Sequence, residues 1–204
     1  MIMNSKRFLT GLLIVSAVLG LVASFALTFE TIQVAKDANY QPACSINPII
    51  TCSSAMNSEE ASIIAGIPNS MWGIVAFTGL LAVAVLLSIG SVMSWKAWAM
   101  ILGAAFGGVA FTVYLYLISL FKLGTICPWC SVIWVTVPLI YFGVVRLAAQ
   151  SNRDDDLGKT WPARFEKFVA GLDSWASFAL IMWYTILILG LVVIFWEYWS
   201  SLIG

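Results

Sequence analysis

Long runs without an internal charged residue dominate this sequence. They cover approximately residues 8–29, 71–92, 97–121, 126–146 and 174–196. A bilayer core about 30 Å thick is crossed by roughly 20 apolar residues in a helix, so each run is long enough to span a membrane. The chain is therefore predicted to be an all-α integral membrane protein, with a single membrane domain over residues 1–204.

The composition agrees with a membrane protein and excludes several functions. Hydrophobic residues make up 61% of the chain and charged residues only 10%, which is too few to solvate a globular surface. The formal net charge of zero argues against a nucleic-acid partner, which would require a basic excess. No histidine occurs, so histidine-based catalysis and histidine–metal sites are excluded. The uncharged spans also disfavour an ion or proton transporter.

The distribution of lysine and arginine predicts the orientation of the spans. If the N-terminus is cytoplasmic, eight basic residues lie inside: Lys6, Arg7, Lys96, Arg146, Arg153, Lys159, Arg164 and Lys167. Only Lys36 and Lys122 then lie outside. This bias predicts a multi-pass protein of the inner or plasma membrane with its N-terminus in the cytoplasm. The first uncharged run is longer than a typical signal-peptide core, so we expect it to be retained as a helix.

Two loops are predicted to carry short helices. In the outer loop, residues 30–70, Asn57 or Ser58 is placed to cap a helix over about residues 58–65 that stops at Gly66. In the cytoplasmic loop, residues 147–173, apolar residues recur at helical spacing and predict a helix lying in the membrane interface. They are Trp161, Phe165, Phe168, Val169 and Leu172.

The four cysteines are the obvious reactive side chains, and the predicted orientation places all of them at the outer face. Cys127 and Cys130 lie in the first turn of a span, where free N–H groups and the helix dipole stabilise a thiolate. Cys44 and Cys52 lie in the outer loop, where a disulfide between them is either a structural bridge or one half of a relay. Thiol–disulfide exchange between the two pairs would pass electrons from one to the other. A zinc site is disfavoured because only one pair has close spacing.

These residues together resemble the vitamin K epoxide reductase family. The resemblance rests on Cys44 and Cys52, then Ser58, then the stretch from Gly66 to Gly73 that includes Pro68 and Asn69, then the pair Cys127 and Cys130. It covers roughly residues 8–147 and is strongest to the bacterial branch. Many bacterial relatives carry a fused thioredoxin-like domain after a fifth span, and we expect this chain to be a homologue without that domain.

The resemblance implies a four-helix transmembrane bundle around a quinone site, with the fifth transmembrane helix peripheral. It implies that Cys44 and Cys52 are an outer shuttle pair, that one of them, Cys52 in preference to Cys44, exchanges with Cys127, and that Cys130 faces the quinone. Asn69 matches an asparagine that hydrogen-bonds a quinone carbonyl, and Ser58 matches a serine near that site. Trp134 stands where animal members have a tyrosine, and its indole N–H can donate but not accept a hydrogen bond.

The implied activity is a membrane thiol:quinone oxidoreductase that supports disulfide-bond formation. It would take electrons from a secreted thioredoxin-like, DsbA-like protein and reduce a membrane quinone, menaquinone or ubiquinone. Reduction of a quinone or its epoxide by external dithiols uses the same residues and stays open. So does a non-catalytic membrane scaffold with a structural disulfide.

Overall fold

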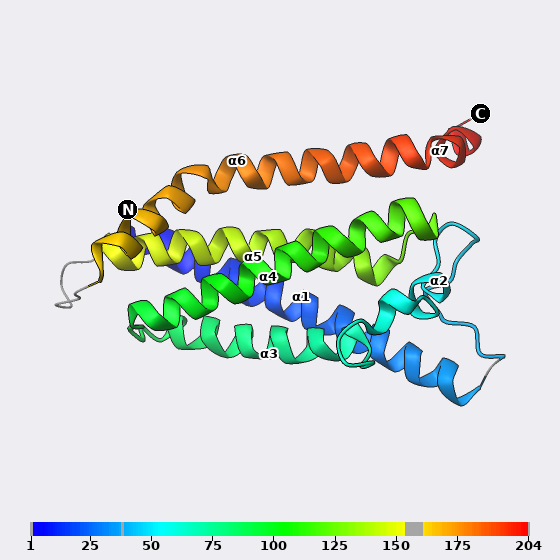
Figure 1. The fold of residues 1–204 in the computed structure, drawn as a ribbon, viewed down its shortest axis with the longest axis horizontal. Coiled ribbons are helices and arrows are strands. Elements are labelled where there is room, and N and C mark those ends of the chain that lie inside the picture. Colours follow the sequence, from blue (N-terminus) through cyan, green and yellow to red (C-terminus); the bar gives the residue numbers. More distant parts are fainter. Residues whose placement is uncertain (1, 38, 154–160, 204) are drawn as a thin grey trace.

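The computed structural model describes residues 2–37, 39–153 and 161–203, and it is built from helices joined by loops, of which the one between Lys36 and Ser53 is long (Figure 1). In chain order the helical segments are α1 (Ile2–Lys36), α2 (Ser53–Met56), the 3-10 helix η1 (Glu59–Ser62), α3 (Asn69–Ser88), α4 (Trp95–Ile118), the π-helix η2 (Ser119–Leu123), α5 (Pro128–Arg153), α6 (Ala163–Ile194) and α7 (Trp196–Ile203).

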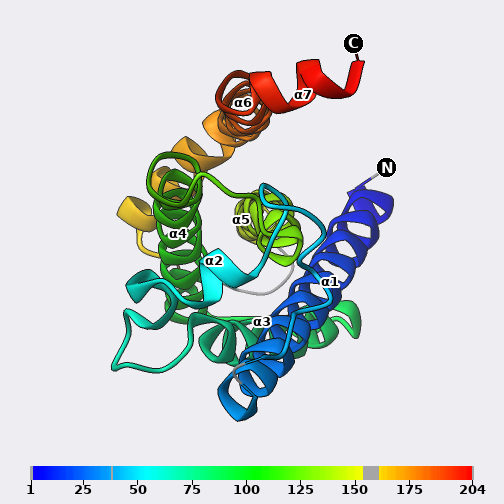
Figure 2. The same ribbon diagram turned by 90° about the vertical axis from the view of Figure 1, so that its right-hand side faces the viewer.

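Five of the described helices are long and apolar enough to cross a membrane: α1, α3, α4 with η2, α5 and α6. Viewed along the bundle, α1, α3, α4 and α5 surround a common interior, and α6 lies outside them (Figure 2). Exposed apolar side chains such as Trp175 and Ile181 cover α6, as expected of a helix that faces lipid. The predicted fold, a four-helix membrane bundle with a peripheral fifth helix, is confirmed.

The bundle is closely packed toward the N-terminal end of α1. Leu13, Val145 and Ala148 are fully buried there and Trp98 is 1% exposed. Further along, α1 approaches α3 so closely that a Cβ atom at Gly20 would overlap the ring of Phe77. Glycine permits this approach, because any side chain at this position would have to displace that ring.

The segment predicted to form a separate interfacial helix is instead the beginning of α6. Helix α6 runs without interruption from Ala163 to Ile194, while residues 154–160 of the predicted loop lie outside the described residues. The apolar stripe packs on the bundle: Val169 is fully buried, and the rings of Phe165 and Trp95 lie 5.8 Å apart. The stripe therefore reflects contacts with neighbouring helices, which a helical period alone does not distinguish from contact with lipid.

The outer loop is less helical than the sequence suggests. In place of one helix over residues 58–65, it forms the short α2 and the four-residue η1. Ser58 directly precedes η1, but its hydroxyl donates to the carbonyl of Ala55 (3.0 Å) and does not cap the helix. Ala65 and Gly66 then adopt positive φ angles of 55° and 69°, which turn the chain toward α3.

Candidate active site

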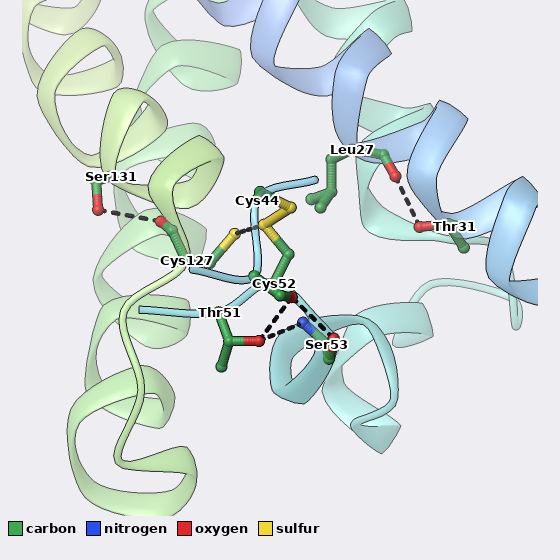
Figure 3. The surroundings of a disulfide bond; sticks show 9 residues. Leu27, Thr31, Cys44, Thr51, Cys52, Ser53, Cys127 and Ser131 are labelled. Atoms are coloured by element: carbon green, nitrogen blue, oxygen red, sulfur yellow. Dashed lines mark hydrogen bonds between the residues drawn. A yellow bond between two sulfur atoms is a disulfide. The ribbon is translucent and has the colours of Figure 1, made fainter. Parts of the chain in front are cut away.

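Three cysteine sulfurs meet where the outer loop lies against the start of α5. Cys44 and Cys52 form a disulfide, and the Sγ atom of Cys127 lies 3.3 Å from that of Cys52 (Figure 3). Cys44, Cys52 and Cys127 are 8%, 0% and 2% exposed. Cys127 and Cys130 are free thiols. Because disulfide exchange requires direct attack of one sulfur on another, this contact is the geometry that exchange between the two pairs needs.

Backbone hydrogen bonds fix the register that brings Cys52 beside Cys127. Ile50 and Ile126 form a parallel bridge, in which the N–H of Thr51 donates to Ile126 (3.0 Å) and the N–H of Ile126 donates to Ile49 (2.7 Å). Each cysteine follows this bridge within two residues, so both enter the same space from neighbouring backbones.

The position of Cys127 favours its thiolate form. It directly precedes α5, outside the membrane-spanning segment, and its carbonyl accepts the N–H of Ser131 (3.0 Å). Hydrogen bonds from the Cys130 thiol and from the backbone N–H groups of Cys130 and Trp129 lower the pKa of Cys127, although burial opposes them. The first turn of α5 therefore stabilises the thiolate form of Cys127, which is the form that takes part in disulfide exchange.

Three hydroxyl groups hold the segment around the disulfide in place. Ser45 lies within hydrogen-bond distance of Thr51 (2.8 Å) and of Ser53 (3.0 Å), and the N–H of Ser53 donates to Thr51 (3.1 Å). These residues were not among the predicted site residues. Their only sequence signal is that each lies directly beside Cys44 or Cys52 in the chain.

Two cavities of different character lie next to the cysteines. One, of about 100 Å³, is lined by Ser58, Asn69, Cys127, Cys130 and Trp134 among others. The second, of about 590 Å³, lies among α1, α3, α4 and α5, with a mainly apolar lining that includes Asn69, Cys130 and Trp134. Asn69, Cys130 and Trp134 therefore stand where the two spaces adjoin, whereas Ser58 and Cys127 line only the smaller one.

Asn69 presents both halves of its amide group at this junction. Its Nδ2 donates to the backbone carbonyl of Glu60 (2.5 Å), while its buried Oδ1 has no partner. The second Nδ2 hydrogen can donate to a carbonyl, and Oδ1 can accept from a hydroxyl. A quinone ring presents carbonyls when oxidised and hydroxyls when reduced. The larger cavity has the size of a small-molecule pocket, so both the space and the polar groups suit a quinone.

Trp134 is nearly completely buried, at 2% exposed. Its ring meets Tyr116 edge to face at 5.1 Å, and its carbonyl accepts the indole N–H of Trp183 from α6 (2.9 Å). These contacts fix the residue as part of the wall of both cavities. Whether its indole N–H contacts a bound ring stays a prediction.

An ion pair between Glu60 and Lys122 connects η1 to η2 beside the smaller cavity. The Glu60 side chain is 12% exposed and that of Lys122 is 55% exposed. The hydrogen bond from Lys122 lowers the pKa of Glu60. The pair was not predicted as part of the site, although Lys122 was noted as one of the few basic residues outside. Among the described residues, no group of histidine, cysteine and carboxylate side chains could hold a metal ion.

Comparison with known families gives one match. The model described as the Vitamin K epoxide reductase family matches residues 11–145, which is most of the chain. The matched segment contains the four cysteines, Ser58, Asn69 and Trp134, and it ends within α5. No curated protein matches the chain significantly.

Proposed function

The chain belongs to the vitamin K epoxide reductase family of membrane oxidoreductases, and we propose that it oxidises an extracytoplasmic dithiol protein and reduces a membrane quinone. The dithiol protein would be thioredoxin-like and of the DsbA type, and the quinone would be menaquinone or ubiquinone. The observation that carries this proposal is the 3.3 Å contact between the sulfurs of Cys52 and Cys127.

In the proposed cycle, the partner's dithiol first reduces the Cys44–Cys52 disulfide and becomes a disulfide itself. The Cys52 thiolate then attacks Cys127 in a Cys127–Cys130 disulfide, and Cys130 leaves as a thiolate. Attack by Cys44 on Cys52 restores the first disulfide and frees Cys127. Two electrons and two protons have then moved from the partner to Cys127 and Cys130.

In the last step, Cys127 and Cys130 return to a disulfide and the quinone takes up both electrons and both protons. Cys130 lines both cavities and is the cysteine placed to face the quinone ring. Asn69 would donate to the ring carbonyl and then accept from the hydroxyl that replaces it. The disulfide and free thiols of the structure correspond to the state just before this step.

The proposed orientation has the N-terminus in the cytoplasm and all four cysteines at the outer end. In Figure 1 the outer loop with α2 lies at the end of the bundle opposite the N-terminus. A membrane-impermeant maleimide applied to intact cells is expected to label Cys44 and Cys52 after mild reduction. Labelling only after the cells are broken would reverse the orientation.

The central test is Cys130→Ala. We expect quinone reduction to be lost while the Cys44–Cys52 disulfide still forms, because the outer pair does not require Cys130. Val132→Ala, two residues along the same helix and outside both cavity linings, serves as the matched control. Normal quinone turnover in Cys130→Ala would refute the assignment and favour a scaffold with a structural disulfide.

A further inference from the structure

Helix α7 is hydrogen-bonded to the loop that carries Cys44 and Cys52. The side-chain amide of Asn47 donates to the hydroxyl of Tyr198 (3.1 Å), across 151 positions of sequence. Helix α7 lies outside the segment that matches the family, which ends at residue 145. The contact therefore joins the outer loop of the family core to a helix beyond that core.

The other half of the Asn47 side chain shapes the turn between the two outer cysteines. Its Oδ1 accepts the backbone N–H groups of Ile49 (2.9 Å) and Ile50 (2.7 Å). The carbonyl of Ile50 in turn accepts the N–H groups of Ile46 (2.9 Å) and Asn47 (3.2 Å). The amide of Asn47 is thus used on both sides, toward its own turn and toward Tyr198.

This turn leads directly into the backbone bridge beside the sulfurs. Ile49 and Thr51 make the two hydrogen bonds to Ile126, and Cys52 follows. Both sides of the bridge also share an apolar cluster with α7, because Ile49 and Ile126 pack against the same buried core as Tyr198 and Trp199. A continuous set of contacts therefore runs from Tyr198 through Asn47 and the bridge to the contact between Cys52 and Cys127.

We propose that Tyr198 and Asn47 are positioning residues that hold Cys52 against Cys127. The meaning of this contact as a catalytic step rests on the proposed function, but the positioning itself does not. The outer loop has two tasks in the proposed cycle, to meet an external dithiol and to meet Cys127. The hydrogen bond between Asn47 and Tyr198 favours the loop position in which Cys52 contacts Cys127 over a position in which the loop meets the external dithiol.

Loss of this hydrogen bond has two opposite consequences. Cys52 spends less time beside Cys127, so a bond between them forms more slowly. The Cys44–Cys52 disulfide, now less buried on average, is attacked faster by an external thiol. General unfolding would also change both rates in these directions, so the variants are compared at unchanged thermal stability, where only lost positioning explains the two changes.

The test uses the full chain with Cys44→Ser and Cys130→Ser, which leaves only Cys52 and Cys127. Diamide then oxidises the two thiols to one disulfide, takes up their two electrons and two protons, and the cross-linking rate is measured. We expect Tyr198→Phe, which keeps the ring and removes only the hydroxyl, to slow cross-linking roughly twofold to tenfold. Tyr184→Phe is the matched control, because Tyr184 also lies C-terminal to the family match and its hydroxyl donates to Val135 (2.8 Å).

In the chain with all four cysteines, Tyr198→Phe is expected to accelerate reduction of the outer disulfide by dithiothreitol relative to Tyr184→Phe. Asn47→Ala should slow cross-linking more than Tyr198→Phe, and the double variant should be no slower than Asn47→Ala alone, because both residues act through one set of contacts. Equal cross-linking rates for Tyr198→Phe and Tyr184→Phe would overturn the proposal.

Neither measurement uses the quinone or the protein partner. If quinone reduction proves absent while cross-linking still depends on Tyr198, the proposed function fails and the positioning role stands. If quinone is reduced and cross-linking ignores Tyr198, the reverse holds.

Discussion

The two ends of the bundle are constructed in different ways. At the end near the N-terminus, large apolar side chains such as Trp98 and Val145 are buried, and neither of them lines the two cavities described above. An ion pair there, Arg146 to Asp173 (2.9 Å), joins α5 to α6. At the opposite end, the cavities adjoin the cysteines, and the loops are held by hydrogen bonds from backbone, hydroxyl and amide groups.

The comparison indicates that the packed end determines the stability of the bundle, whereas the contacts at the other end serve its chemistry. Close packing resists any displacement, because side chains in a dense interior have no alternative arrangement of similar energy. A single hydrogen bond contributes less to the free energy of unfolding than the close packing of a large buried side chain. It can also be exchanged for another hydrogen bond of similar energy. The outer loop needs this second kind of contact, since Cys52 must leave one sulfur for another. We expect substitutions at the packed end to change stability and substitutions at the cysteine end to change turnover.

The largest effect is expected at the packed end, from Trp98→Ala. Removing a fully buried tryptophan leaves a cavity and costs about 3 kcal/mol of unfolding free energy. Equilibrium unfolding in detergent micelles measures this loss, and quinone turnover per folded molecule is expected to stay unchanged. Trp175→Ala is the matched control, because Trp175 is 66% exposed on α6. Reduced turnover without reduced stability would contradict the division between the two ends.

At the cysteine end, Asn69→Leu is expected to lower kcat/KM for quinone by roughly 30-fold, about 2 kcal/mol, because a buried donor and acceptor are lost from the ring site. Steady-state quinone reduction with a chemical dithiol as donor gives the value. Asn57→Leu makes the same change at an exposed loop position and should have little effect. If Asn69→Leu instead lowers stability and leaves kcat/KM unchanged, the residue is only a structural link to Glu60.

The pH dependence of Cys127 reactivity tests the local electrostatics. Since the Cys130 thiol and two backbone N–H groups lower the pKa of Cys127, its alkylation by iodoacetamide should reach half its maximum rate below pH 9.0, the ordinary value. Cys130→Ala removes the first of these donors and should move the midpoint upward. The rate is measured by mass spectrometry on the reduced protein. An unchanged midpoint in Cys130→Ala would show that Cys130 does not stabilise the thiolate.

The smallest effect is expected from Lys122→Gln, which removes the ion pair with Glu60. Quinone turnover should fall by no more than about twofold, since ion pairs with an exposed partner contribute little. The pKa of Glu60, now lowered by Lys122, should rise toward its ordinary 4.5. In the unmodified protein, the ion pair between Glu60 and Lys122 is therefore fully formed at neutral pH. It is lost only as the pH falls through the lowered pKa of Glu60. Lys96→Gln, at the start of α4, is the matched control.

The helices follow from local patterns in the sequence, and their grouping follows from the family resemblance. Apolar runs of sufficient length predict the spans, and the distances between the cysteines along the chain suggest two redox pairs. The prediction of a separate helix over this segment was wrong, because the segment begins α6 and the stripe around Val169 packs on other helices, and an apolar stripe does not reveal what covers it.

The contacts that link distant loops leave no such pattern. Asn47 and Tyr198 pair across 151 positions, and Glu60 and Lys122 across 62. The sequence around each of these residues is that of an ordinary loop or helix end and gives no sign of a distant partner. Only the folded backbone brings the partners together. The same holds for the bridge between Ile50 and Ile126, which depends on the π-helix and turn that precede Cys127.

The gathering of sulfurs and Asn69 at one end of the bundle has an energetic consequence for the cell. Under the proposed function, both electrons and both protons enter from the dithiol and reach the ring near that same face. No elementary charge crosses the hydrocarbon layer during turnover, so the transmembrane voltage has nothing to act upon. Such an enzyme would run at the same rate in energised and de-energised vesicles.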